Sequence, residues 1–243
     1  LVNFLTTGEV RHAVNMASID PKTLEALRGY LNVAYRLGRF LAQWHDGGTA
    51  GCHLQYRGEV ARRDTKLLTS AFCAGLLEGA LAEEVNIVNA EVLCQERGIQ
   101  LSEESRTDPG AFSSSMTAEL RCNGKTFVAS GTLFGANMPR LVRLNDYRLE
   151  AYLDGILLIF THNDVPGIIG RVGTIFGEHQ VNIGQMSVGR ASDEPGGQAV
   201  GVLNLDSVPS AEAVAEVARH PAVTSVKVIT MPAAGKLPPW MAG

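Results

Sequence analysis

The chain has 243 residues, of which 45% are hydrophobic and 19% charged, and its formal net charge is −4. This length is enough for two domains, and the composition is ordinary for a globular protein. The lysines and arginines are scattered, so the chain lacks the basic footprint of a nucleic-acid-binding protein. No apolar run approaches the ~18 residues of a membrane span, and no signal peptide is visible.

Residues 1–18 read as the end of another unit. Leu1, Phe4 and Leu5 have helical spacing, and Gly8 can end that helix. Because the sequence also starts with leucine rather than methionine, we expect a fragment whose N-terminal part is missing.

Residues 19–152 predict a domain of helices packed on an antiparallel sheet. Asp20 followed by Pro21 is typical of a helix start, and apolar residues recur every three or four positions over residues 24–41. Further helices are expected from Asp64 onwards and over residues 83–97, and strands over residues 52–59, 99–106, 115–122, 125–134 and 140–147. Helices early and strands late argue against a doubly wound parallel sheet.

Residues 153–230 predict a second, smaller domain. Strands are expected over residues 156–161, 181–189, 199–205 and 223–229, with helices over residues 166–180 and from Ser207 or Ser210 to His220. This βαββαβ order is that of the ferredoxin-like split βαβ fold. The whole chain is therefore expected to be a mixed α/β (α+β) protein, and the proline-containing residues 231–243 are expected to be a mobile tail.

Motifs for catalysis and for cofactors are missing. No G-x-G-x-x-G follows a predicted strand, and neither a P-loop nor a G-x-S-x-G is present. The spacing of Gly170, Gly173 and Gly177 inside a predicted helix indicates packing rather than a dinucleotide loop. No CxxC or Cys/His spacing for a metal involves the four cysteines, Cys52, Cys73, Cys94 and Cys122. We expect reduced thiols in a cytoplasmic protein, and no catalytic residue, cofactor or metal site in this sequence.

The strongest candidate for a binding site lies at residues 160–170, where a strand leads through a polar turn into a helix. His162 and Asp164 are two apart at the strand end, so their side chains project to the same side. Pro166 suits the first turn of a helix, whose first N–H groups carry the positive end of the dipole. This arrangement suits a free amino acid, which carries one carboxylate and one ammonium. A simple strand-to-helix turn capped by Asp164 explains the same residues.

Asn182 begins the strand after this helix, at the end far from His162. The two side chains cannot easily face each other within one copy but could do so across a dimer, and a turn asparagine is the alternative interpretation. Two basic groups can hold a phosphate or can simply form a solvated face; they are Arg140, Arg143 and Arg148 near the domain junction, and Arg62, Arg63 and Lys66 before the second helix.

Five segments of the smaller domain resemble the ACT domain at the C-terminal end of long-form D-3-phosphoglycerate dehydrogenases. They are His162-x-Asp164-x-Pro166-Gly167-Ile168-Ile169-Gly170-Arg171-Val172-Gly173, Val181-Asn182-Ile183, Met186-x-Val188-Gly189-Arg190, Gly197-x-Ala199 and Val223-x-x-Val226-x-Val228. Residues 19–150 resemble the intervening, allosteric substrate-binding domain of this family. Residues 8–16 resemble the final segment of its catalytic core.

The resemblance implies an activity for the full-length protein, which is the NAD-dependent oxidation of 3-phospho-D-glycerate to 3-phosphohydroxypyruvate in L-serine biosynthesis. The NAD-binding glycines and the catalytic residues of the family lie upstream of this sequence. The fragment is therefore expected to hold no cofactor and to be inactive alone.

The resemblance also implies an effector site for L-serine between two ACT domains, and hence self-association as a homodimer or homotetramer. The family's effector-contacting positions fall on His162, Asp164 and Asn182, with backbone groups of Val165, Gly167 and Ile168 beside them. A second set of positions, which lines an anion site in relatives, falls on Arg140 and close to Arg148. Tyr152 stands where some relatives have an arginine.

Two other functions fit part of these observations. An iron–sulfur L-serine dehydratase pairs a related middle domain with an ACT domain, although residues 8–16 match a dehydrogenase core better. A stand-alone amino-acid sensor without enzymatic activity would carry the same candidate site.

Overall fold

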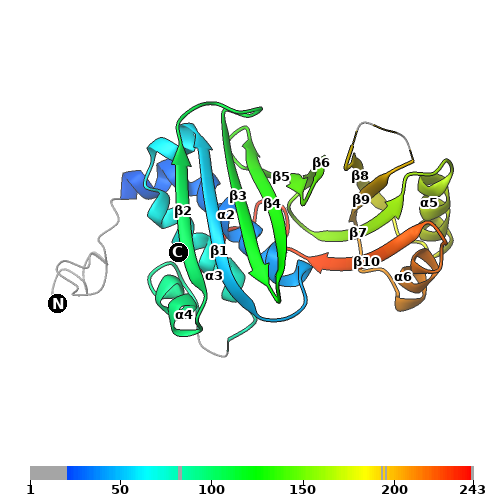
Figure 1. Cartoon of the computed structure of the whole chain (residues 1–243), viewed down its shortest axis with the longest axis horizontal. Coiled ribbons are helices and arrows are strands. Elements are labelled where there is room, and N and C mark those ends of the chain that lie inside the picture. The colour runs from blue at the N-terminus through cyan, green and yellow to red at the C-terminus, as the bar shows by residue number, and fades with distance from the viewer. Residues whose placement is uncertain (1–20, 82–83, 193, 195, 242–243) are drawn as a thin grey trace.

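The computed structural model describes residues 21–81, 84–192, 194 and 196–241. It contains two sheets, which Figure 1 shows side by side, with α5 and α6 at the far end of the smaller one. The predicted core-end segment, residues 1–18, lies outside the described residues. Within the described part, no helix is both long enough and apolar enough to cross a membrane.

The larger unit is a six-stranded sheet in the order β2-β1-β3-β4-β5-β6. Its elements are α2 (Pro21–Trp44), β1 (Thr49–Gly58), η1 (Glu59–Arg62), α3 (Thr65–Leu77), α4 (Ala90–Glu96), β2 (Gln100–Arg106), β3 (Ser114–Cys122), β4 (Lys125–Phe134), β5 (Met138–Leu144) and β6 (Tyr147–Tyr152). Burial alternates along β1 and β3, as expected for strands with one covered face. The buried Leu54 and Tyr56 of β1 share one core with Leu31 of α2 and Phe72 of α3.

One pair of strands differs from the predicted antiparallel sheet. β1 and β2 pair in parallel, with Leu54 opposite Glu103, whereas the other described pairs of this sheet are antiparallel. A parallel pair needs a crossover connection of a dozen or more residues, and η1, α3 and α4 provide it. The sheet is therefore mixed, and the prediction of a wholly antiparallel sheet is wrong.

The third predicted helix is also shorter than expected. Helix α4 covers Ala90–Glu96 rather than residues 83–97. The side-chain oxygen of Asn86 accepts a hydrogen bond from the Val88 N–H at 2.9 Å, and that of Asn89 accepts one from the Asn86 N–H at 2.9 Å. Asparagine side chains that bond nearby backbone groups compete with helix formation, so the helix begins only after Asn89.

The strand predicted over residues 140–147 is in fact two strands, β5 and β6. Asn145 lies between them with a φ of 50°, in the left-handed region, and its side-chain oxygen accepts a hydrogen bond from the Val128 N–H at 2.9 Å. Asparagine tolerates this backbone conformation better than most residues. The chain therefore reverses at Asn145, and β6 is added as the edge strand of the sheet.

The smaller unit confirms the predicted βαββαβ order. Its elements are β7 (Ile156–Asn163), α5 (Ile168–Glu178), β8 (Ile183–Arg190), β9 (Gln198–Leu205), α6 (Ala211–Ala218) and β10 (Val223–Thr230). The strands form an antiparallel sheet in the order β10-β7-β9-β8. Leu158 and Phe160 of β7 belong to the core formed with α5 and α6, whereas Leu157 and Ile159 belong to the core of the larger unit. The central strand of this sheet is thus buried on both faces.

The two units also meet along β6 and β8. A Cβ atom added to Gly189 of β8 would lie 2.4 Å from the carbonyl oxygen of Arg148 in β6. The side chain of Gln185 accepts a hydrogen bond from the Tyr152 N–H at 3.2 Å and donates one to the Glu150 carbonyl at 3.0 Å. The position of the smaller sheet is therefore coupled to the edge strand of the larger one.

The C-terminal segment, which is predicted to be a mobile tail, has contacts with the larger unit. Met231 donates its N–H to the Gly155 carbonyl at 2.7 Å, and Trp240, within η2 (Pro239–Met241), packs edge-on against Tyr35 of α2 with ring centroids 6.2 Å apart. The three prolines of this segment reduce the number of conformations open to the unfolded chain, so ordering the segment costs less entropy. The segment also contacts α2. Residues 231–241 therefore pack against the larger unit, and their mobility stays a prediction.

The glycines of α3 and α5 have different surroundings. A Cβ atom added to Gly75 of α3 would lie 2.0 Å from the Tyr35 carbonyl oxygen of α2, so the two helices approach too closely there for any side chain. On α5, by contrast, a Cβ atom added to Gly170, Gly173 or Gly177 would meet no atom within 4 Å. These three glycines therefore mark no close contact in the described part of the chain, and their packing role stays a prediction.

Gly75→Ala is expected to lower the free energy of unfolding by about 1–3 kcal/mol, the usual effect of overpacking a core. Gly177→Ala is the matched control, and it is expected to raise stability by up to about 1 kcal/mol through helix propensity alone. Urea denaturation of both variants measures the difference. Similar changes of the same sign in the two variants would contradict the close helix contact at Gly75.

Candidate functional site

The loop from β7 to α5 forms the candidate site. Gly167 adopts a φ of 90°, in the left-handed region that glycine favours, and stands immediately before the first helical residue, Ile168. The helix therefore begins two residues later than predicted, since the left-handed turn at Gly167 separates Pro166 from it. The Gly167 carbonyl accepts the N–H of Arg171 at 2.9 Å, so the first turn of α5 is well formed.

His162 lies beneath this loop and is fully buried. Its ring stacks on Phe160 with centroids 5.1 Å apart, and its Nδ1 lies 2.8 Å from the Asn163 carbonyl oxygen. A carbonyl can only accept, so Nδ1 carries a proton, and in the neutral ring Nε2 is then an acceptor. Nε2 has no hydrogen-bond partner among the described residues. A buried acceptor without a partner is costly, and in the single chain this atom is closed to solvent.

Asp164 lies beside His162 and is held by a second strand. Its Oδ2 lies 2.7 Å from Nε of Arg190, at the end of β8, and its side chain is 18% exposed. Its backbone N–H donates to the Gly197 carbonyl at 2.8 Å. No side chain caps α5, so Asp164 is not the cap that the alternative interpretation assumed, although a strand-to-helix turn without a ligand stays an open alternative. Sequence reasoning missed the role of Arg190, although that residue closes the Met186–Arg190 motif.

Asn182 lies at the opposite end of α5 from His162. An 11-residue helix is about 16 Å long. The exposed side chain of Asn182 donates from Nδ2 to Oδ2 of Asp206 at 2.6 Å, a partner that the sequence did not indicate. One chain therefore brings together His162, Asp164 and the backbone from Val165 to Ile168, but it leaves Asn182 apart from them, as the spacing predicted.

The outer edge of β8 is the remaining feature of this site. β8 pairs with β9 on one side, and no described strand pairs with its other edge. Val188, in the middle of β8, is 43% exposed. An unpaired strand edge offers a row of N–H and C=O groups to a second strand. Asn182 immediately precedes this edge and Arg190 ends it.

The two residues of the predicted anion site are not brought together. Arg140 is 91% removed from solvent, with its guanidinium 4.1 Å from the ring centre of Tyr152 and 5.5 Å from that of Phe134. Its Nε lies 3.7 Å from Oε1 of Glu150 and has no hydrogen-bond partner among the described residues. Arg148 is exposed and lies opposite Arg143 in the register of β5 and β6. Tyr152, where some relatives carry an arginine, thus forms a wall over Arg140, and the anion site stays a prediction.

Comparison with known proteins matches both units. Residues 26–145 match the D-3-phosphoglycerate dehydrogenase intervening domain, and residues 156–222 match the ACT domain. A D-3-phosphoglycerate dehydrogenase of Archaeoglobus fulgidus is 33% identical over 219 residues, which is 90% of this chain and 41% of that protein. Those of Methanocaldococcus jannaschii and Bacillus subtilis are 33% and 30% identical, each over 92% of this chain and 42% of theirs. The chain therefore spans about two fifths of the length of these relatives.

Proposed function

Because the chain belongs to the D-3-phosphoglycerate dehydrogenase family, as an intervening domain followed by an ACT domain, we propose that it is the regulatory part of such an enzyme. The activity would be the NAD-dependent oxidation of 3-phospho-D-glycerate in L-serine biosynthesis. The relatives reported above all carry this name, which favours the dehydrogenase over an iron–sulfur L-serine dehydratase. The four cysteines are free and buried, which supports a reducing, cytoplasmic setting.

The residues present do not fit NAD. Among the described elements, neither sheet is doubly wound, and the loop from β7 to α5 carries one glycine instead of the three that bring a pyrophosphate close to a helix. We therefore assign NAD binding and catalysis to parts of the enzyme other than these residues, and regulation to the ACT domain.

The single observation that carries the regulatory assignment is the buried, unpaired Nε2 of His162 beside Asp164 and the start of α5. L-serine offers a matching group to each partner. Its carboxylate suits the positive end of α5, its ammonium suits the carboxylate of Asp164, and its hydroxyl can donate to Nε2. Val165, Gly167 and Ile168 contribute the backbone around the carboxylate.

The partner chain would complete this site through the edge of β8. Twofold dimers place the same surface of each copy against the other. Antiparallel pairing of two β8 edges then sets the start of one strand beside the end of the other. Asn182 of one copy would lie beside Arg190, and therefore Asp164, of its partner, and L-serine would bridge the two chains. A homodimer is the minimum assembly, and a homotetramer would contain two such pairs.

Regulation requires that L-serine bind one arrangement of the enzyme better than another. β8 supplies a route for this difference, because its Gly189 and Gln185 contact β6 of the intervening domain. A ligand that locks two β8 strands together would therefore fix the intervening domains relative to one another.

A thermal-denaturation series with amino acids tests this assignment. L-serine at a hundred times its dissociation constant is expected to raise the melting temperature by roughly 5–10 °C. L-alanine lacks the hydroxyl and D-serine exchanges the positions of the groups, so both should give much smaller shifts at the same concentration. Equal shifts with all three, or none with L-serine at millimolar concentration, would count against the proposed effector.

A further inference from the structure

The C-terminal strap, defined here as residues 231–241, runs back from β10 over α2 of the larger unit. It begins where the chain has just crossed the junction between the units for the second time. The Gly155 N–H donates to the Pro232 carbonyl at 3.1 Å, and the Met231 N–H donates to the Gly155 carbonyl at 2.7 Å. The strap is thus tied to the first crossing, residues 153–155, as well as to α2.

Arg36 of α2 binds the strap through the strap's backbone carbonyl groups alone. This fully buried guanidinium uses all five of its N–H groups. Nε donates to Asn32 Oδ1 at 2.9 Å, and Nη1 donates to the Leu153 carbonyl at 2.9 Å. The other three bonds reach carbonyls of the strap, those of Pro232 at 2.7 Å, Ala233 at 3.0 Å and Lys236 at 2.7 Å. One side chain therefore joins α2, the linker between the units and the strap.

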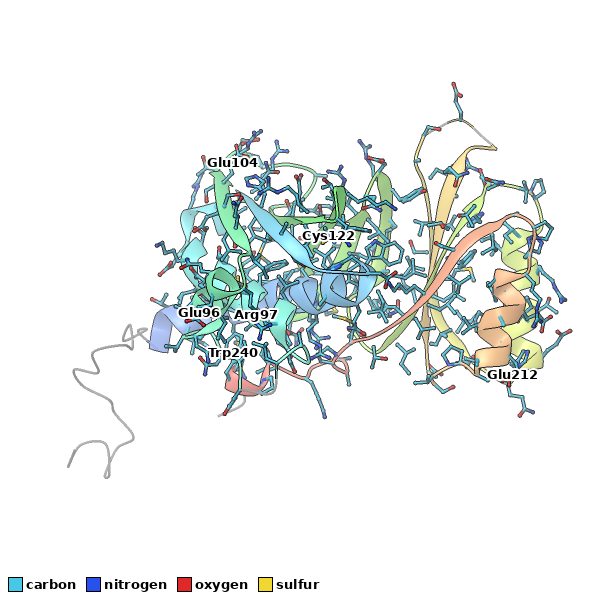
Figure 2. The ribbon with its side chains drawn as sticks, turned by 60° about the horizontal axis from the view of Figure 1, so that its bottom comes forward. Glu96, Arg97, Glu104, Cys122, Glu212 and Trp240 are labelled. Atoms are coloured by element: carbon cyan, nitrogen blue, oxygen red, sulfur yellow. The ribbon has the colours of Figure 1, made fainter. Side chains whose placement is uncertain are left out.

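The far end of the strap is anchored less well. Trp240 packs edge-on against Tyr35, and Figure 2 shows it on the larger unit, away from the helices of the smaller one. Its Nε1 is buried and has no hydrogen-bond partner among the described residues. An unpaired buried donor is costly. The apolar contact of Trp240 therefore stabilises the docked strap, whereas the unpaired Nε1 destabilises it.

The strap also forms one wall of a cavity of about 530 Å³. The other walls come from α2 and from the turn between β4 and β5, and the lining includes Glu25, Asn32, Leu133, Asn137, Gly235 and Leu237. Asn32 is the residue that accepts from Arg36. Movement of the strap would therefore open this cavity and remove three partners of Arg36 together.

We propose that residues 231–241 are a releasable strap that locks the ACT domain onto α2, with Arg36 as its latch. Because Arg36 binds backbone carbonyl groups of the strap, these hydrogen bonds do not depend on the strap's side chains. With the strap docked, both chain crossings are fixed to α2. With the strap released, the linker loses its fixed position, while the shared core and the β6–β8 contacts still hold the two units together.

Hydrogen exchange followed by mass spectrometry on the full chain tests this proposal. Arg36→Lys keeps the charge but loses the five-donor fork, and it is expected to speed amide exchange at residues 153–156 and in the strap by about tenfold or more. Exchange in α3 and α5 should stay unchanged. Lys236→Ala is the matched control, because it removes an exposed side chain and leaves the carbonyl that Arg36 binds.

Trp240→Ala provides a second variant that disturbs no charge. It should speed exchange in the strap and at residues 153–156 while leaving α3 and α5 as in the parent chain. Equal acceleration in all segments would mean that Arg36 and Trp240 only support the fold, and no acceleration would mean that the strap locks nothing. Either result overturns the proposal.

Discussion

Replacing Arg36 with methionine is expected to lower the free energy of unfolding by about 3–5 kcal/mol, the range for a buried charge network that loses one member. Methionine fills a similar volume but donates nothing. Four carbonyl groups, of Leu153, Pro232, Ala233 and Lys236, would lose their shared donor. The Pro232 carbonyl keeps the Gly155 N–H, whereas the buried Leu153 carbonyl would be left unpaired, with its own desolvation cost.

Electrostatics make this position unusually sensitive. Burial lowers the pKa of the Arg36 guanidinium, and burial raises the pKa of the nearby Asp154 carboxyl, while the attraction between the two groups opposes both shifts. The carbonyl dipoles are thus the direct partners that keep the charge inside. Arg36 is therefore not one of the solvent-exposed polar residues that the amphipathic pattern of α2 would predict.

Urea denaturation of Arg36→Met beside Arg28→Met gives the measurement. Arg28 lies on the same helix, but it is exposed, and among the described residues its ion pair is with Glu25 at 3.3 Å. Its replacement should cost no more than about 1 kcal/mol, as for most surface ion pairs. A loss below 1 kcal/mol for Arg36→Met would mean that the five-bond network contributes little.

Asp164→Ala is expected to weaken L-serine binding by about 10- to 100-fold, the equivalent of one charge-assisted hydrogen bond. The carboxylate is partly buried and fixed by Arg190, so it meets the ligand's ammonium with little loss of side-chain freedom. Isothermal titration calorimetry measures the change. Asp46→Ala is the control, since Asp46 also pairs with a basic residue of the ACT domain, Lys227 at 2.8 Å, but lies far from α5 in the fold.

A comparison with Arg190→Ala separates two roles of Asp164. If Asp164 contacts the ligand, its removal should weaken binding much more than removal of Arg190. If Asp164 acts only by holding the end of β8, both variants should weaken binding to the same extent. The second outcome would contradict the assignment of Asp164 to the ammonium.

The sequence predicted those features that depend on neighbours along the chain. The βαββαβ order follows from strand and helix periodicity, and the contiguous loop from His162 to Ile168 needed no long-range contact to be found. Errors arose where a few side chains overrode the pattern. The bonds of Asn86 and Asn89 shorten α4, and the left-handed Asn145 divides one strand into two.

Features that join distant parts of the chain could not be predicted. Arg36 and its carbonyl partners are separated by 117 to 200 residues, and no local pattern links an arginine to backbone carbonyls so far away. The ion pair of Asp164 with Arg190 likewise depends on where β8 ends in the sheet. The free Nε2 of His162 depends on which ring nitrogen meets the Asn163 carbonyl, which is a matter of three-dimensional geometry.

In the proposed site, L-serine binds between two chains, with Asp164 from one and Asn182 from the other. Mixing chains that carry Asp164→Ala with chains that carry Asn182→Ala, after reversible dissociation, tests it most directly. A mixed dimer would have one doubly altered site and one intact site. Half of the dimers would be mixed, so calorimetry should recover about one quarter of the parent's high-affinity sites, although neither variant alone has any. If the mixture binds no more tightly than the separate variants, the two residues do not meet across the dimer, and the proposed site is wrong.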